Sequence, residues 1–117
     1  HLTRRVRGLP FWFSLAAHGT NAYTEAVEEG IRLAKESAKL ISAHPNLELV
    51  CEPELSIVAF KRKGWTPAQY QEWSDALLEK QIGFIPPSKN LGEPILRFAF
   101  VNPWTSLDDV QVILYTL

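Results

Sequence analysis

The sequence lacks several features that would assign it to a particular class of protein. It has no methionine and a single cysteine among its 117 residues. One cysteine cannot form an internal disulfide or build a cysteine-rich zinc site, so Cys51 indicates a reducing, cytoplasmic location. No run of about 18 apolar residues occurs, and we therefore expect no membrane-spanning helix and no membrane partner.

The chain also has no excess of charge of either sign. Lysine and arginine number 12 and aspartate and glutamate 13, which leaves a formal net charge of −1. This balance removes the electrostatic argument for nucleic acid as a partner. Hydrophobic residues make up 46% and charged residues 21%, as in a folded domain. Residues 1–117 are long enough for one domain.

The absence of methionine extends to position 1, where the chain begins with His1. A primary translation product begins with methionine. We therefore expect residues 1–117 to be a processed chain or a piece of a longer protein.

Apolar periodicity and capping residues predict four helices. The first covers about 9–18 and ends at Gly19, which suits a helix terminus. The second begins at Thr20 or Asn21 and ends near His44, with an apolar stripe that includes Val27 and a solvated charged face that includes Arg32. The third extends from Thr66, which can form a capping box with Gln69, to about Gln81 and is expected to bury Tyr70, Trp73, Leu77 and Leu78. The last extends from Thr105 or Ser106 to about Tyr115.

Short apolar runs between these helices predict four strands. They cover 47–51, 56–61, 84–86 and 95–101. Tight turns join them, and the first two strands have no helix between them, which a parallel arrangement would need. The pattern therefore predicts an α+β domain, a small antiparallel sheet of about four strands with helices packed on one face.

No complete active site is evident from residue types and spacing. His1, His18 and His44 are far apart and have no acidic or cysteine partner at the spacing of metal ligands. Cys51 has no adjacent cation, so we interpret it as a buried thiol. Asp108 and Asp109 suit the first turn of a helix. We assign no catalytic, metal-binding or cofactor-binding residue.

Arg97 is the one residue that stands out. Strand alternation places Leu96, Phe98 and Phe100 on one face, which is the expected core face. The other face carries Arg97 among three apolar side chains, those of Ile95, Ala99 and Val101. We expect this face to be covered by a domain outside the chain, with the guanidinium clamping a carboxylate or phosphate. The alternative is an arginine that extends to the edge of the sheet.

Several segments of the chain resemble the C-terminal part of the pyridoxal-phosphate-dependent group II decarboxylases. The strongest is Arg97 within Ile95–Pro103, followed by Thr105 and Asp108-Asp109-Val110. The opening, with Arg4, Leu9, Phe11, Trp12, Leu15 and Gly19, is similar to the arginine-led helix of that family. The segments 44–49 and 53–60 resemble the strands that follow it. The chain departs from the family at Thr3, Arg7 and Pro10.

The resemblance implies a function for the enzyme that would contain this chain. It would be a lyase in which pyridoxal 5'-phosphate forms an imine with an amino acid, acts as an electron sink and releases the carboxylate as carbon dioxide. The resemblance implies that Arg97 contacts the carboxylate side of the substrate. It also implies a homodimer and a large cofactor-binding domain in the same polypeptide, upstream of this small domain.

The imine-forming lysine, its preceding histidine and the phosphate-binding residues lie upstream in that family. We therefore expect the 117-residue chain alone to bind no pyridoxal phosphate and to be inactive. Two alternatives stay open. The chain could be a stand-alone α+β binding or oligomerisation module, or the small domain of another pyridoxal-phosphate enzyme such as an aminotransferase. The sequence does not identify the amino acid substrate.

Overall fold

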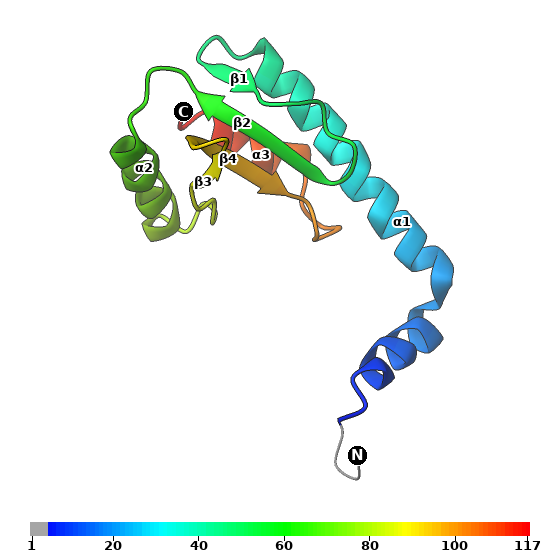
Figure 1. Ribbon diagram of the computed structural model, residues 1–117. Helices are drawn as coiled ribbons and strands as arrows, with labels where there is room; N and C mark the ends of the chain where they lie inside the picture. The colour runs from blue at the N-terminus through cyan, green and yellow to red at the C-terminus, as the bar shows by residue number, and fades with distance from the viewer. Residues whose placement is uncertain (1–4) are drawn as a thin grey trace.

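The computed structural model describes residues 5–117, so Arg4 of the family-like opening lies outside the described residues. Three helices and four strands follow one another along the chain (Figure 1). In order they are α1 (Gly8–Ala43), β1 (Leu47–Leu49), β2 (Ile57–Arg62), α2 (Pro67–Glu79), β3 (Ser88–Asn90), β4 (Glu93–Ala99) and α3 (Leu107–Leu114). The predicted α+β class is confirmed.

The four strands form one antiparallel sheet in the order β1-β2-β4-β3. The two central strands pair over Ile57–Phe60 and Leu96–Ala99. The third strand is shifted from its predicted place at 84–86 to Ser88–Asn90, so that prediction was wrong. Pro86 and Pro87 lack the N–H groups that a ladder needs, and pairing begins directly after them.

Gly19 divides α1 into two parts. Its φ of 77° and ψ of 163° break the helical conformation, which confirms the predicted end of one helix and start of the next. After the kink the buried positions recur every three or four residues from Gly30 to Ile41. Val27 was predicted to belong to this stripe but is 60% exposed, because contact with the sheet begins only at Gly30.

The other two helices begin at capping boxes. Thr66 and Gln69 satisfy each other's backbone N–H groups at the start of α2, as the sequence predicts, and Ser106 and Asp109 do so for α3. Within α2, Tyr70 and Leu77 are buried, whereas Leu78 was predicted to be buried and is 52% exposed.

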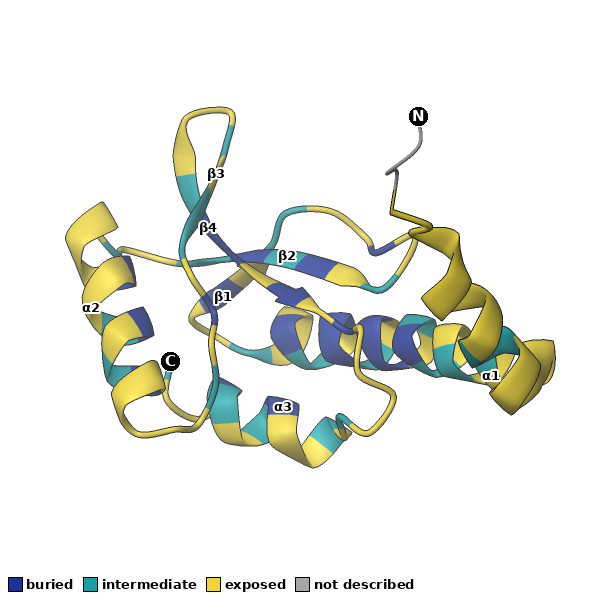
Figure 2. Ribbon diagram, turned by 90° about the horizontal axis from the view of Figure 1, so that it is seen from below, coloured by how far each residue is buried: buried dark blue, intermediate teal, exposed yellow. Residues whose placement is uncertain are grey.

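Two helices cover one face of the sheet and leave the other face open (Figure 2). The covered face is the one on which α1 and α3 lie, and it holds most of the hydrophobic core. The strands contribute Leu47, Val58, Phe60, Leu96 and Phe98 to this core, and Phe100 joins them directly after β4. Gly30 of α1 lies so close to the end of β4 that a Cβ atom there would be 2.8 Å from the carbonyl oxygen of Phe100.

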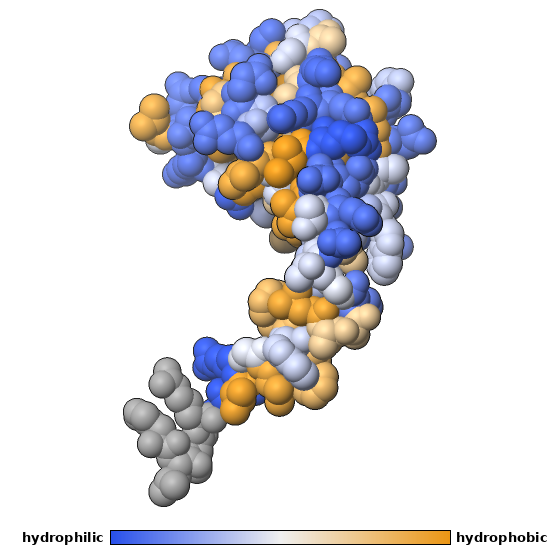
Figure 3. Space-filling view, turned by 90° about the vertical axis from the view of Figure 1, so that its right-hand side faces the viewer, coloured by the Kyte–Doolittle hydropathy of each residue, from blue (hydrophilic) through white to orange (hydrophobic). Residues whose placement is uncertain are grey.

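The part of α1 before Gly19 extends away from this body (Figure 3). Three of its aromatic side chains, those of Phe11, Trp12 and Phe13, are 58–60% exposed. Apolar residues therefore dominate the surface of this segment, with Leu9 exposed as well. Within residues 5–117, no helix combines the length and the apolar character needed to cross a membrane.

Candidate functional site

The open face of the sheet, defined here as the face opposite α1 and α3, carries Arg97. Alternation along β4 places Leu96, Phe98 and Phe100 in the core, each 7% exposed or less, and leaves Arg97 and Ala99 exposed on the other side. The predicted assignment of the two faces of this strand is therefore confirmed.

The neighbours of Arg97 on the open face are small or apolar. Ala59 of β2 lies opposite Arg97, and Ile57, which is 49% exposed, lies opposite Ala99. Within residues 5–117, Arg97 forms no ion pair, so its charge is uncompensated by the part of the chain that the structure describes. A guanidinium in this setting is available for a carboxylate or phosphate from elsewhere.

The second cation of the open face is already paired. Lys61 of β2 forms an ion pair with Glu93 of β4. The hydrogen bond from Lys61 lowers the pKa of Glu93, and the same bond raises the pKa of Lys61. The open face therefore combines one lysine that is ion-paired with one arginine that forms no ion pair within residues 5–117.

The expected exposure of the other apolar residues on this face needs one correction. Ala99 is exposed and Val101 is 86% exposed, but Ile95 is only 7% exposed. Ile95 lies opposite Ser88, where β4 has a strand on each side. Ala99 lies beyond the end of β3 and lacks that second neighbour.

A cavity of about 350 Å³ lies where β4 extends beyond its pairing with β3. Its polar lining residues are Arg97, Thr105 and Asp109. Apolar side chains of three segments complete it: those of Phe84, Ile85, Pro86, Phe98, Ala99, Phe100, Val110 and Ile113. The cavity thus combines apolar walls with the cation of Arg97, and it suits a small molecule whose carboxylate binds Arg97 away from the Asp109 carboxylate.

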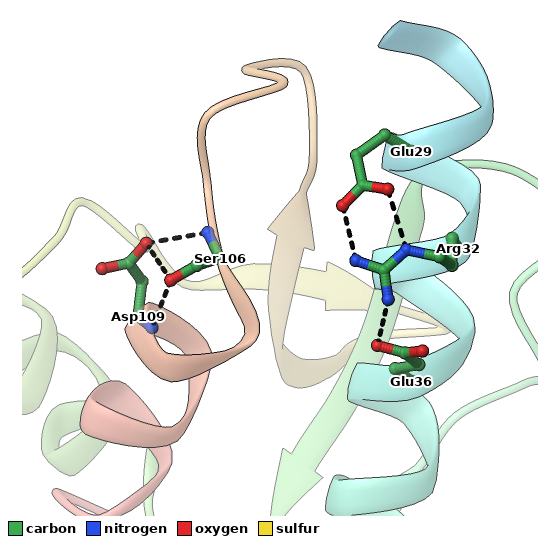
Figure 4. Close-up of polar contacts among 5 residues, drawn as sticks. All are labelled: Glu29, Arg32, Glu36, Ser106 and Asp109. Atoms are coloured by element: carbon green, nitrogen blue, oxygen red, sulfur yellow. Dashed lines mark hydrogen bonds and ion pairs between the residues drawn. The ribbon is translucent and has the colours of Figure 1, made fainter. Parts of the chain in front are cut away.

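Asp109 lines the cavity but also forms the capping box of α3 with the N-cap residue Ser106 (Figure 4). Its Oδ2 accepts hydrogen bonds of 2.8 Å from both the backbone N–H and the hydroxyl of Ser106. The backbone N–H and then the hydroxyl of Ser106 lower the pKa of Asp109. Asp109 is therefore an ionised carboxylate at neutral pH rather than a proton donor.

Of the residues dismissed from the sequence, His1 lies outside the described residues. No group of three or more histidine, cysteine, aspartate or glutamate residues within 5–117 could hold a metal ion. Cys51, however, is exposed, so its interpretation as a buried thiol was wrong. It lies two residues past the end of β1, an edge strand, where no second layer of side chains covers it.

A cluster of charged residues on α1 belongs to its solvated face (Figure 4). The Nε atom of Arg32 donates to Glu29 at 2.8 Å, and its Nη1 atom donates to Glu36. These hydrogen bonds, the one to Glu29 above all, raise the pKa of Arg32. The Arg32 side chain is half exposed, so this network is a surface network, as the sequence predicts.

Comparison with known proteins identifies a family. Residues 1–63 match the pyridoxal-dependent decarboxylase conserved domain. The chain is 31% identical over 114 residues to histidine decarboxylase of Drosophila melanogaster, which covers 93% of this chain and 13% of the relative. It is 33% identical over 124 residues to aromatic-L-amino-acid decarboxylase of Bacillus atrophaeus, which covers 97% of this chain and 25% of the relative.

The fold agrees with this match. The glutamate decarboxylase domain of a diaminobutyrate-pyruvate transaminase and L-2,4-diaminobutyrate decarboxylase from Vibrio parahaemolyticus superimposes with a TM-score of 0.82 at 22% identity. The superposition covers 97% of this chain and 25% of the other. The chain thus spans a quarter or less of the relatives described here, and it belongs to the pyridoxal-dependent decarboxylase family.

Proposed function

We propose that this chain is the C-terminal small domain of a longer, pyridoxal-phosphate-dependent amino acid decarboxylase. The observation that carries the proposal is the family match over residues 1–63. The chain spans 13% and 25% of two decarboxylase relatives, so most of such an enzyme lies outside these residues. We propose that the missing part is a large cofactor-binding domain and that the enzyme is a homodimer.

The described residues do not fit pyridoxal phosphate. An imine-forming lysine needs a lowered pKa, because only the neutral amine attacks a carbonyl. The pKa of Lys61, the lysine of the open face, is instead raised by its ion pair with Glu93. Lys35 and Lys39 are exposed on α1, and neither lines the cavity beside Arg97. The cofactor therefore belongs to the part of the enzyme outside this chain.

The contribution of this chain is the open face of the sheet. Its exposed apolar side chains, among them Ile57 and Ala99, are suited to packing against a second domain. Packing of that kind would surround Arg97 and remove water from its guanidinium. Low dielectric strengthens the attraction between a guanidinium and a carboxylate, so the domain interface is where Arg97 binds an anion best.

We propose that Arg97 contacts the carboxylate side of the amino acid substrate and thereby orients it. The planar guanidinium can donate two parallel hydrogen bonds to one carboxylate, which fixes direction as well as distance. The cavity at the end of β4 places Thr105 and the Phe84 ring beside it. In this arrangement Arg97 is a substrate-binding residue.

The experiment that tests the function uses the full-length protein that contains this chain. Purified from its complete gene, it should bind pyridoxal phosphate with an imine absorbance band and release carbon dioxide from one or more amino acids in a panel. The panel should include histidine, aromatic, acidic and diamino acids. The 117-residue chain alone should give no such band at micromolar cofactor.

Two outcomes would contradict the proposal. Formation of a keto acid without carbon dioxide would indicate an aminotransferase instead. A full-length protein that neither binds the cofactor nor releases carbon dioxide would indicate a binding or oligomerisation module. Sedimentation of the active protein would test the homodimer separately.

A further inference from the structure

The turn between β3 and β4 contains an unusual leucine. Leu91 and Gly92 form a two-residue loop between the paired residues Asn90 and Glu93. Both loop residues have positive φ, 50° for Leu91 and 87° for Gly92. Leu91 is also 97% exposed, the highest value among the large hydrophobic residues within 5–117. Backbone strain and complete exposure thus coincide at one side chain.

The stability of the hairpin does not explain this residue. Two-residue hairpin loops with positive φ at both positions strongly favour Asn-Gly, Asp-Gly or Gly-Gly. A leucine in the left-handed region brings its Cβ atom close to the following carbonyl oxygen, a conformation seldom adopted by residues with a branched apolar side chain. Almost fully exposed, Leu91 has hardly any contacts in this chain that would offset the strain. Residues that break a local rule in this way are typical of functional positions.

The hairpin projects on the side of the open face. Figure 2 shows the hairpin end of β3 and β4 rising above the other two strands, on the side opposite α1 and α3. The segment of α1 before Gly19 bends to the same side at the other end of the molecule. The open face with Arg97 therefore lies between two projections that each carry exposed apolar side chains. Leu91, at the tip of one of them, is thus placed at the border of the open face.

The polar residues around Leu91 resemble the rim of an interface anchor. Lys89 and Glu93 flank the tip and are exposed, while Leu91 stands between them as the apolar group. Protein interfaces have an apolar core and a polar rim, and a few side chains that fill pockets at the core account for much of the binding energy. A tip of this kind fits an apolar pocket with charged residues at its edge.

We propose that Leu91 is an anchor residue that inserts into an apolar pocket of the large cofactor-binding domain of the same polypeptide. This inference rests on the proposed function, which supplies that domain. The chain covers only 25% of the solved decarboxylase chain that it matches, so about three quarters of such a polypeptide are tethered to it. A tethered domain has a high effective concentration, which favours it over a separate molecule as the occupant.

Two substitutions in the full-length protein test the anchor. Leu91→Asn supplies the residue that the turn prefers but removes the apolar side chain. Leu91→Met keeps an apolar side chain of similar volume in the same strained conformation. In the anchored enzyme, Leu91→Asn lowers the apparent melting temperature by about 2 °C or more and speeds hydrogen exchange of the amides of 88–93 about ten-fold. Leu91→Met behaves like the wild type.

If the hairpin is not anchored, Leu91→Asn changes the melting temperature and the exchange rate in the opposite direction. Leu91→Asn then relieves the strain, raises the melting temperature and slows exchange at 88–93, and that result would overturn the proposal. The amides of 88–93 could also lose their protection from hydrogen exchange only when the protein dissociates into smaller species. That result would assign Leu91 to a contact with a second copy of the chain and would also overturn the proposal. Both readouts are independent of catalysis, so absence of decarboxylation in the wild type refutes the proposed function separately.

Discussion

The two faces of strand β4 have opposite surroundings although their residues alternate along one segment. Leu96, Phe98 and Phe100 are 0–7% exposed beneath α1 and α3, whereas Arg97 and Ala99 are exposed. The covered face stabilises the domain through buried apolar area. The open face contributes little to that core, and its residues are free to serve an interface. A change on one face should therefore affect folding, and a change on the other should affect function.

The two parts of α1 differ in the same way, since one is covered by the sheet and the other is not. After the Gly19 kink its apolar residues pack on β1 and β2, with Leu33, Ala34 and Ile41 at most 1% exposed. Before the kink, Phe11 and Trp12 remain about 60% exposed. Composition alone does not separate the parts, since both are rich in apolar residues. The difference is whether a second layer of the same chain lies against them.

The largest expected effect is on the covered face. Phe98→Ala should lower the free energy of unfolding by about 3–5 kcal/mol, because it removes a buried ring and leaves a cavity. Phe98 lies with its ring centroid 4.9 Å from that of Phe60 and 5.8 Å from that of Phe100. Chemical denaturation of the variant measures the loss. The control Val101→Ala, at a position that is 86% exposed, should change stability by less than about 0.5 kcal/mol.

Gly30→Ala should lower stability by about 1–2 kcal/mol. Helix propensity alone predicts a gain of about 1 kcal/mol for the same change. The expected sign is reversed because the new Cβ atom would lie 2.8 Å from the carbonyl oxygen of Phe100, and backbone must move to admit it. Equilibrium unfolding decides between the two signs. A stabilised variant would show that α1 packs on β4 less closely than described.

The cap of α3 should have a smaller effect. Ser106→Ala removes the hydroxyl that accepts from the Asp109 N–H at 3.2 Å, and should cost about 1 kcal/mol. Thermal unfolding measures it, with Ser42→Ala at an exposed position of α1 as the control. An unchanged melting temperature would mean that α3 needs no cap to cover the sheet.

The smallest expected effect is on how the free energy of unfolding depends on pH, through the capping box of α3. The hydrogen bonds from Ser106 lower the pKa of Asp109 below its ordinary value of 3.8. A group with a lowered pKa contributes stability above its unfolded pKa and loses it as the pH falls through its folded pKa. Asp109→Asn should therefore destabilise the domain at neutral pH and flatten the decline of stability below about pH 4. Urea unfolding between about pH 2 and pH 7 compares the two proteins; parallel curves would contradict the cap.

Much of the fold could be predicted from local signals. Thr66 and Gln69 predict the start of α2, because a capping box involves only four consecutive residues. Gly19 predicts the break in α1, because the conformational freedom of a glycine is likewise a local property. The predictions of burial were wrong where residues distant in the sequence determine which side chains are covered. Leu78 has the spacing of a buried residue, yet α2 packs on the sheet through its Tyr70 and Leu77 side and leaves Leu78 outside.

The candidate site could be predicted only in part. Arg97 was found because strand alternation is a property of one segment. The cavity beside it was not, since Phe84, Thr105 and Ile113 come from three separate segments that only the folded chain brings together. The exposure of Leu91 at a position of positive φ was missed as well. Asn90-Leu91-Gly92 reads as a turn, but the turn type depends on the register of β3 and β4.

The most direct test of the division between the two faces is Arg97→Ala in the full-length protein, with catalytic efficiency and thermal stability measured on the same sample. Loss of a charge-assisted hydrogen bond to a carboxylate costs about 1.5–3 kcal/mol, so kcat/KM should fall about ten- to a hundred-fold. Arg97→Lys should also be impaired, because it keeps the charge but loses the planar fork. The melting temperature should match the wild type in both variants. Wild-type kcat/KM in both variants, or a loss of stability as large as that of Phe98→Ala, would contradict the account.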